Sequence, residues 1–405
     1  MNTIDIKELI KNRKIDTFFQ PIISARTKTT IGLEALSRTV CFETGNVIPF
    51  PIMMQEAIQQ GLTIELDRLC REKAVENFIA IPQRHDDLLL FINLDTTIVD
   101  KGVVGSGHLI NLINRMGLKP ENVVIEILEA NITNTEALER FASTYREYGF
   151  LLAIDDMGIG SSNLERTMHL KPDIIKVDRA LVQHVDRDYY KQEVFKSLVG
   201  LSRKIGALVV AEGIETEAEA LTSLELGADM LQGFYFLKPQ KIDQDTFSDF
   251  TIKIDTIAVN YKQTRIESIR QEQIALKFYN KIMETIIVEL NRVSLAGFES
   301  KLTKFVNLFP ALEYLYILDM NGQQVTGSVC CSEKCFRQGR KIFKAGLYGA
   351  DQSLKDYYLY IKAGAERYTS RPYMSLASGN LCITESVVFR DMRNNKYILC
   401  ADFNP

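Results

Sequence analysis

Residues 151–160 read LLAIDDMGIG, and the interpretation of the whole chain begins with this stretch. Its four leading apolar residues are typical of a buried strand, and the glycines that follow indicate a tight turn. Asp155 and Asp156 therefore stand together at the end of a strand. Adjacent carboxylates repel each other and are costly to bury, and a divalent cation would relieve both effects. The simpler alternative is a solvated turn in which one aspartate caps a following helix.

Length and composition predict a globular protein of more than one domain. The chain has 405 residues, of which 46% are apolar and 25% charged. This length exceeds one ordinary core, so two or three domains are expected. The net charge of −4 gives no reason to expect a nucleic-acid polymer as a partner.

Targeting signals are the next feature to consider. No apolar run approaches the roughly 18 residues of a spanning helix, and residues 1–8, MNTIDIKE, do not have the pattern of a signal peptide. The seven cysteines are an odd number, which fits a reducing compartment. We therefore expect a cytoplasmic protein without membrane insertion.

The N-terminal region predicts an antiparallel strand pair. Residues 15–23 and 29–36 have strand patterns, and only the short polar segment 24–28 lies between them. Because that segment is too short for a crossover helix, the two strands must run antiparallel. A helical pattern follows over residues 50–80.

Strands and helices then alternate, which predicts the fold class. The expected strands are 88–94, 122–128, 151–156, 173–177, 208–211 and 230–236, and the expected helices are 108–116, 134–148, 190–205 and 216–226. Eight strands within about 240 residues favour an α/β fold of the (β/α)8, TIM-like type over an open doubly wound sheet. The initial hairpin makes one of the eight strands antiparallel.

Polar residues occur at the strand ends, where such barrels carry their chemistry. They are Glu34, Asn93, Glu126, Asp155, Asp156, Lys176, Glu212 and Gln232. Any one of them alone is explained as a cap or a surface residue. Together, five carboxylates, two amides and a lysine predict one or two hard divalent ions, such as Mg2+ or Mn2+. Metal-assisted phosphodiester hydrolysis is the reaction class that suits this set best, with the lysine near the attacking water or a phosphoryl oxygen.

The C-terminal part of the chain has a different pattern. Residues 251–293 predict a long helix that pairs either with a partner subunit or with its own second domain. Beyond it, hairpins are expected at 312–318 with 323–329, around Asn321-Gly322, and at 383–389 with 397–403. The predicted organisation is a barrel domain (1–245), a connecting helix (246–295) and a small α+β domain of five or six strands for sensing or dimerisation (296–405).

An ordered set of motifs resembles the EAL-domain family of bacterial cyclic-di-GMP phosphodiesterases. The signature itself is Glu34-Ala35-Leu36, and the resemblance runs from Phe18-Phe19-Gln20-Pro21 to Leu237-Lys238-Pro239. It includes Asn93, Ile125-Glu126-Ile127-Leu128-Glu129, Asp155-Asp156-Met157-Gly158, Lys176-Val177-Asp178, Ala211-Glu212-Gly213-Ile214-Glu215-Thr216 and Gln232-Gly233-Phe234. The family fold is a barrel with one antiparallel strand, in agreement with the hairpin argument. The C-terminal domain is similar to PAS or Cache sensors.

The resemblance implies an enzyme that binds cyclic-di-GMP and opens it to the linear dinucleotide pGpG, under control of the C-terminal domain and as a homodimer. It implies these roles: metal ligands Glu34, Asn93, Glu126, Asp155 and Asp156; catalytic residues Lys176, Glu212 and Glu34; substrate-binding residues Gln20, Leu36, Arg38, Asn93, Asp178, Gln232 and Pro239; and a loop anchor, Glu129. Lys176 would position the water, and Arg38 would contact phosphate.

Two departures from the family pattern support an alternative function. Leu128 stands where the family usually has Thr, and residues 157–163 read MGIGSSN where the family usually has Phe-Gly-Thr-Gly-Tyr-Ser-Ser. In the family this loop links the second metal to the dimer interface. The alternative is a catalytically weak or inactive cyclic-di-GMP receptor that signals through the altered loop after Asp156.

Overall fold

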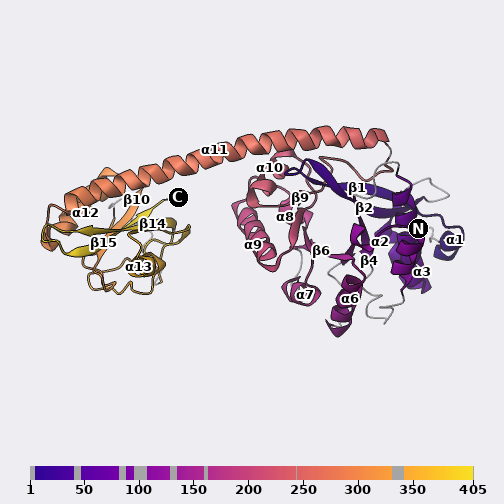
Figure 1. The fold of residues 1–405 in the computed structure, drawn as a ribbon, viewed down its shortest axis with the longest axis horizontal. Helices are drawn as coiled ribbons and strands as arrows, with labels where there is room; N and C mark the ends of the chain where they lie inside the picture. Colours follow the sequence, from indigo (N-terminus) through magenta and orange to yellow (C-terminus); the bar gives the residue numbers. More distant parts are fainter. Residues whose placement is uncertain are drawn as a thin grey trace. The chain divides into compact units, whose positions relative to one another are not determined.

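The computed structural model divides the chain into two compact units, Met1–Ile266 and Glu267–Pro405. It describes residues 5–40, 47–81, 88–94, 107–127, 135–158, 163–242, 244–330 and 342–404. Each unit has its own sheet and its own core, and each is described by itself below (Figure 1).

The first unit is a closed barrel of eight strands. The strands of this sheet are β1 (Asp16–Ser24), β2 (Thr29–Val40), β3 (Val47–Pro49), β4 (Leu89–Leu94), β5 (Val123–Ile127), β6 (Leu151–Met157), β7 (Ile174–Val177), β8 (Leu208–Ala211) and β9 (Met230–Leu231). Their order is β1-β9-β8-β7-β6-β5-β4-β2-β3, and pairing of β1 with β2 closes the barrel. β1 runs antiparallel to both β2 and β9, whereas the other barrel pairs are parallel. The predicted barrel and its antiparallel strand are confirmed.

Helices surround these strands (Figure 1). They are α1 (Ile6–Lys11), α2 (Phe50–Gln60), α3 (Thr63–Ile79), α5 (His108–Met116), η2 (Pro120–Asn122), α6 (Thr135–Glu147), α7 (Asn163–Leu170), α8 (Arg179–Val182), α9 (Tyr189–Ile205) and α10 (Glu217–Leu226). The helix predicted at residues 216–226 begins one residue later because Thr216 is its N-cap, in a capping box with Glu219.

Two predicted strand boundaries were wrong. β9 ends at Leu231 and not at residue 236, because the chain turns at Gly233, where an added Cβ would lie 2.1 Å from the backbone of Ile214. β2 continues to Val40 because its last residues pair with β3, outside the barrel. Glu34 therefore lies within β2 and not near its end.

The barrel interior is closed by an apolar layer, to which seven strands contribute one side chain each. These side chains, which we call the interior plug, are Ile22, Phe91, Val124, Ala153, Ile174, Val210 and Met230. The eighth strand contributes Gly32, because a Cβ there would lie 2.7 Å from the ring of Phe91. The layer is packed with side chains, as in other barrels of this size.

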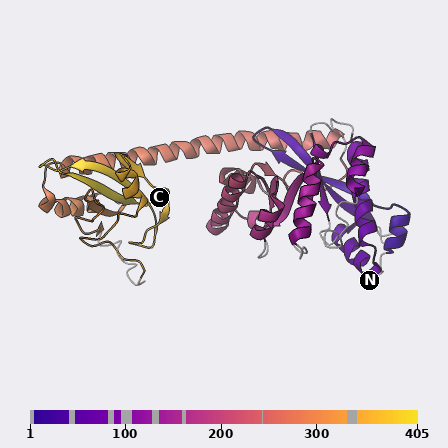
Figure 2. The ribbon, with the colours of Figure 1, turned by 60° about the horizontal axis from the view of Figure 1, so that its bottom comes forward.

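The second unit is a six-stranded antiparallel sheet. Its strands are β10 (Leu312–Leu318), β11 (Val329–Cys330), β12 (Arg367–Thr369), β13 (Tyr373–Met374), β14 (Leu381–Arg390) and β15 (Lys396–Phe403), and its helices are α12 (Leu295–Leu308) and α13 (Asp356–Lys362). In Figure 2 these strands, in orange to yellow, form one sheet with helices against it. The hairpin of β14 and β15 is confirmed, with Arg390 opposite Lys396. The first hairpin was only partly right, because the strand expected at 323–329 meets β10 at one isolated bridge, between Gln324 and Leu318, and then at β11.

Helix α11 (Gln244–Leu290) contributes to both cores. In its N-terminal half, Phe250, Ile254 and Ile257 are buried in the core of the first unit. In its C-terminal half, Ile282 and Met283 are buried in the core of the second unit. The helix thus packs on the second domain of its own chain, which is one of the two expected arrangements. In the described parts of the chain, no helix has both the length and the hydrophobicity of a bilayer-spanning segment.

Asp402, on β15, is expected to make the second unit less stable as pH rises. Burial raises the pKa of this carboxyl from 3.8 to about 7, Glu313 adds to the shift, and the hydrogen bond from Thr384 opposes it. Between about pH 4 and 7 the folded state therefore holds a proton that the unfolded chain has released, so the free energy of unfolding falls as pH rises, by about 4 kcal/mol at most. We expect Asp402→Asn to remove this loss.

The check is urea unfolding of the wild type and of Asp402→Asn from pH 4 to pH 8. The difference in stability should be small at pH 4 and largest above pH 7. The exposed Asp356→Asn is the control and should give a difference that changes little with pH. A constant difference for Asp402→Asn would contradict the prediction.

Candidate active site

A layer of polar side chains lies directly above the interior plug. On each plug strand, the residue two positions toward the barrel mouth is polar: Gln20, Asn93, Glu126, Asp155, Lys176, Glu212 and Gln232. Alternate residues of a strand point to the same face, so these side chains point into the same space as the plug. On β1 the step runs backward along the chain because that strand is antiparallel. Glu34 follows Gly32 in the same way on β2, so all eight strands contribute to this polar layer.

Lys176 is the centre of the polar layer. Its Nζ lies 2.6 Å from Glu126 Oε1, 2.6 Å from Glu212 Oε1, 3.3 Å from Asp155 Oδ1 and 3.5 Å from Glu34 Oε2. The lysine is 1% exposed and Glu126 is fully buried. One ammonium group is thus shared among four carboxylates inside the barrel.

Amide side chains orient Glu34 from two sides. Asn93 Nδ2 donates to Glu34 Oε1 at 3.3 Å, and Gln232 Nε2 donates to Glu34 Oε2. Gln232 Nε2 also donates to Gln20 Oε1 at 3.2 Å, and Gln20 Nε2 donates to the carbonyl of Leu237 at 3.1 Å. These hydrogen bonds link side chains of the polar layer to one another and to the backbone of Leu237. The position of Glu34 therefore depends on residues from distant parts of the sequence.

The ionisation of the polar layer reflects an excess of negative charge. Burial, and then the nearby Glu34, raise the pKa of Glu126 well above its usual value, although Lys176 acts in the opposite direction. Burial also raises the pKa values of Asp155 and Glu212. For Lys176, burial alone would lower the pKa, but the surrounding carboxylates raise it well above 10.5. The lysine is therefore charged, and one positive charge is too few for the carboxylates around it.

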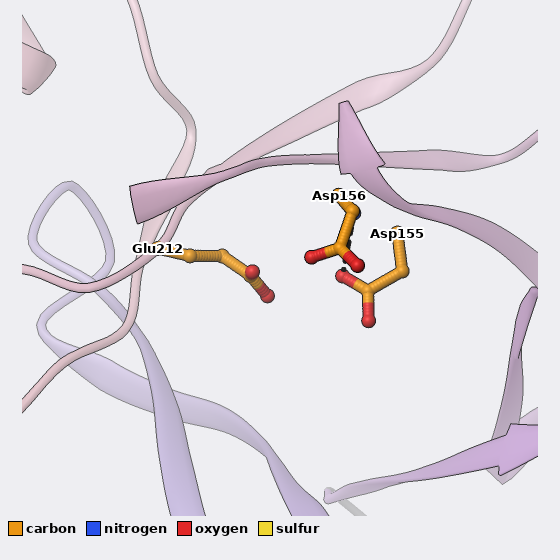
Figure 3. A group of neighbouring side chains, drawn as sticks. All are labelled: Asp155, Asp156 and Glu212. Carbon is orange, nitrogen blue, oxygen red and sulfur yellow. Dashed lines mark hydrogen bonds between the residues drawn. The ribbon is translucent and has the colours of Figure 1, made fainter. Parts of the chain in front are cut away.

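Asp155, Asp156 and Glu212 form a smaller group at the barrel mouth. One carboxylate oxygen from each lies within 4.8 Å of the others. Figure 3 shows the three carboxylates directed toward the same space, two from the end of β6 and one from the residue after β8. Asp156 has a φ of +57°, in the left-handed region, so its side chain does not follow the alternating up-and-down pattern of the strand. Burial and the charge of Asp155 raise the pKa of Asp156 to about 6.

The polar layer fits a divalent cation. Both oxygens of Glu126 are buried, and while Oε1 pairs with Lys176 Nζ at 2.6 Å, Oε2 has no hydrogen-bond partner among the described residues. A buried carboxylate oxygen without a donor is costly, and a hard cation with oxygen ligands would satisfy it. The same cation would neutralise the excess charge that raises the neighbouring pKa values.

Two hollows open beside the polar layer, and both are lined by Glu34 and Leu36. The first, of about 270 Å3, also touches Arg38, Asn93 and helix α3. The second, of about 210 Å3, is lined on its far side by Gln20, Asp155, Lys176, Glu212, Gln232 and Phe234. A ligand could therefore reach the carboxylates from two sides of the strand that carries Glu34.

Comparison with known proteins identifies the family. The sequence profile of the EAL domain matches residues 4–239. The chain belongs to the EAL domain family. The polar layer of the EAL barrel is thus built from the motif residues by which the family resemblance was first identified.

Relatives of this EAL protein include YkuI of Bacillus subtilis, an uncharacterised EAL-domain protein, with 25% identity over 350 residues that cover 84% of this chain and 82% of YkuI. The cyclic di-GMP phosphodiesterase PdeL of Escherichia coli is 27% identical over 237 residues, which cover 57% of this chain and 64% of PdeL. The match to PdeL thus spans less than two thirds of that enzyme.

Solved structures extend the comparison to the fold. The structure of YkuI, in complex with its substrate c-di-GMP and calcium, matches with a TM-score of 0.78 over 99% of both chains, at 23% identity. BlrP1 of Klebsiella pneumoniae, in a calcium and cyclic-di-GMP complex, matches with a TM-score of 0.51 over 56% of each chain, at 30% identity. The match to YkuI covers both units, so the fold of the second unit is shared as well.

Some residues named from the sequence lie away from the centre of the EAL barrel. Asp178 caps helix α8 and contacts Asp156, and neither Asp178 nor Pro239 lines the two hollows. Leu128, Glu129 and residues 159–162 of the altered loop lie outside the described residues. The structure therefore brings together the polar layer with Leu36 and Arg38, which line the hollows.

Several hollow-lining residues were missed by the sequence analysis. Arg179 and Phe234 line the second hollow, and Asp67 and Arg71 line the first. Arg179 directly follows the Lys176-Val177-Asp178 motif, and Phe234 follows Gln232-Gly233, so proximity to those motifs was the available signal. For Asp67 and Arg71 the signal was a pair of opposite charges one helical turn apart on α3.

A divalent cation is expected to stabilise the first unit at pH 8 and to have little effect at pH 5. Cations bind the deprotonated carboxylates, so binding releases protons and weakens as pH falls through the pKa of Asp156, about 6, and the raised values of its neighbours. At a cation concentration of 100 times the Kd, the stabilisation is about 2.7 kcal/mol, or roughly 5–10 °C in Tm. Thermal unfolding with Mn2+, with EDTA as the reference, measures this, and equal Tm shifts at both pH values would contradict it.

Proposed function

We propose that the EAL barrel binds cyclic-di-GMP and hydrolyses one of its phosphodiester bonds to give the linear dinucleotide pGpG. The observation that carries the proposal is the polar layer, in which eight strands present four carboxylates, three amides and one charged lysine above the interior plug. Family membership supports the substrate, because PdeL is named a cyclic di-GMP phosphodiesterase and the YkuI structure contains c-di-GMP as substrate.

The carboxylates are proposed to hold Mg2+ or Mn2+. Glu34, Asn93, Glu126 and Asp155 would hold one ion, and Asp155, Asp156 and Glu212 would serve a second. The calcium in the YkuI and BlrP1 complexes supports a divalent cation of some kind in this family. When bound, the ion supplies Lewis acidity toward the phosphoryl oxygens and lowers the pKa of water.

The residues of this chain then position the water and move its proton. Lys176 Nζ, kept protonated by its carboxylate neighbours, donates hydrogen bonds and holds the attacking water in line with the scissile bond. Glu212, 2.6 Å from Lys176 and with a raised pKa, can accept the proton of that water. Attack of the water oxygen on phosphorus breaks the bond to the 3′ oxygen, which takes up a proton from solvent and leaves as a hydroxyl, so the ring opens.

Substrate contacts are proposed in the two hollows. Gln20, Leu36 and Arg38 would contact the dinucleotide, with Arg38 on a phosphate, since a guanidinium matches phosphate geometry. Arg179 and Phe234, which line the second hollow, are added to this set. Asp178, Pro239 and the loop anchor Glu129 keep the roles implied by the family motifs, in the substrate contacts and in the loop after Asp156.

The chain is further proposed to be a cytoplasmic homodimer of a barrel domain (1–245), a connecting helix (246–295) and a regulatory PAS- or Cache-like domain (296–405). Exposed apolar side chains on α11, among them Val259, Ile266 and Ile274, support dimerisation, since a second copy would remove them from water. Light scattering tests this part of the proposal, and a monomer at micromolar concentration would contradict it.

The test of the function is chromatography of cyclic-di-GMP after incubation with the purified protein and Mn2+ or Mg2+, together with a binding titration of the same sample. Formation of pGpG, blocked by EDTA, is the expected result. Binding without product would replace the enzyme with the receptor function, and restoring Thr at Leu128 and the family loop at 157–163 would then be the next experiment. Absence of binding would overturn both.

A further inference from the structure

The first hollow contains a charged pair that the proposed chemistry does not use. Asp67, Cys70, Arg71 and Ala74 line this hollow, and their spacing of three, four and seven residues places them on one face of α3. Arg71 Nη2 donates to Asp67 Oδ2, and the two side chains are only 8% and 2% exposed. A helix face that could be apolar thus presents a guanidinium group to a cavity beside the polar layer.

Stability alone does not account for this pair. Burying two charges costs more solvation than a single ion pair usually returns, and apolar residues of similar volume often do as well. Asp67 is the only hydrogen-bond partner of Arg71 among the described residues, and the buried Nε has none. Arg71 therefore keeps unused N–H donors while Asp67 holds its guanidinium in place.

The size of the hollows indicates what would meet those donors. Each hollow is smaller than the roughly 300 Å3 at which pockets begin to enclose a whole drug-sized ligand. A cyclic dinucleotide would therefore occupy both, with its phosphates near the polar layer between them and one base in each hollow. The base in the first hollow would lie against the α3 face that carries Arg71.

We propose that Arg71 is a specificity-determining residue that donates to the O6 and N7 acceptors of one guanine base, with Asp67 as its positioning residue. This rests on the proposed function, because it requires cyclic-di-GMP in the site. Arginine matches the O6 and N7 acceptors of guanine with two N–H donors, whereas adenine replaces O6 with an N6 amino donor. Arg71 would thus select guanine by a bond that adenine cannot accept.

The test is Arg71→Lys in the full-length protein. Lysine keeps the charge opposite Asp67 but loses the planar pair of donors. The wild type and the variant are titrated with cyclic-di-GMP and with cyclic-di-AMP in the presence of Ca2+. We expect affinity for cyclic-di-GMP to fall about tenfold and affinity for cyclic-di-AMP to stay the same, so that the preference for guanine shrinks about tenfold. The control is Arg68→Lys on the same helix, outside both hollows, which should leave the preference unchanged.

A second variant tests the same role in case Arg71→Lys does not fold. Asp67→Asn with Arg71→Met removes both charges together, so no unpaired buried charge remains, and it should lose the guanine preference in the same way. Equal losses for both dinucleotides, or no loss for either, would overturn the role of Arg71. If the wild type binds cyclic-di-GMP but Arg71→Lys keeps its preference, only this inference fails. If the wild type binds neither ligand, the proposed function fails first and the inference fails with it.

Discussion

Glu34→Ala is expected to reduce metal-dependent cleavage of cyclic-di-GMP on the order of 10^3-fold while the barrel remains folded. Glu34 is a proposed metal ligand, and it also accepts hydrogen bonds from Asn93 and Gln232 and lies 3.5 Å from Lys176. Loss of a metal ligand removes several kcal/mol of transition-state stabilisation, and each 1.36 kcal/mol corresponds to a factor of ten in rate. The measurement is kcat with Mn2+, together with a circular dichroism spectrum of each protein.

Two further variants sharpen this experiment. Glu34→Gln keeps the shape of the side chain but removes its charge, so it should lose as much activity as Glu34→Ala if charge is what matters. Glu225→Ala, at an exposed position on α10, controls for the loss of a glutamate as such and should behave as the wild type. Unchanged cleavage in Glu34→Ala would refute the assignment of Glu34 as a metal ligand.

Lys176→Met is expected to lower kcat about 10^2 to 10^3-fold and to destabilise the metal-free barrel by about 3–5 kcal/mol. The loss of rate follows from removing the donor that positions the water. The loss of stability follows because Glu126, Glu212 and Asp155 would share a buried site without a counter-charge. The variant should therefore gain more Tm from added Mn2+ than the wild type does.

A matched lysine makes that experiment specific. Lys196→Met removes a lysine from the surface of α9, where it pairs with Glu193, and should change neither rate nor Tm appreciably, because surface ion pairs contribute little. If Lys176→Met gained no more Tm from Mn2+ than the wild type, the polar layer would not be the cation site.

The polar layer could be predicted because a strand repeats every two residues. Once Asp155 was read as the end of a buried strand, polar residues at the ends of the neighbouring strands were expected to lie near it, and the structure places Glu34, Asn93, Glu126, Lys176, Glu212 and Gln232 above the interior plug. Gln20 of the reversed strand β1 was not among the residues expected from this pattern, and Asp156 turns aside at its φ of +57°. The five-residue connection between the first two strands was equally informative, because no helix fits into it. These are local properties, so a single sequence contains them.

Features that depend on contacts between distant segments could not be predicted in this way. Residues 232–236 are rich in aromatic side chains and have a strand pattern, but Gly233 lies so close to the backbone of Ile214 that the chain turns there. Asp67 and Arg71 are opposite charges one helical turn apart on α3, but this spacing does not indicate that the pair is buried and lines a hollow. The product and the oligomeric state depend on a ligand and on a second copy of the chain, and no periodicity within one chain contains them.

The reversed strand β1 has a consequence for how this protein folds as it is synthesised. Its Ile23 pairs with Leu231 of β9, so the first strand of the barrel to be synthesised must wait for the last before the barrel can close. Until then β1 and β2 form a hairpin with one unpaired edge, and contacts so far apart in sequence form slowly. We therefore expect the nascent N-terminal half to be most exposed to aggregation before residue 231 emerges.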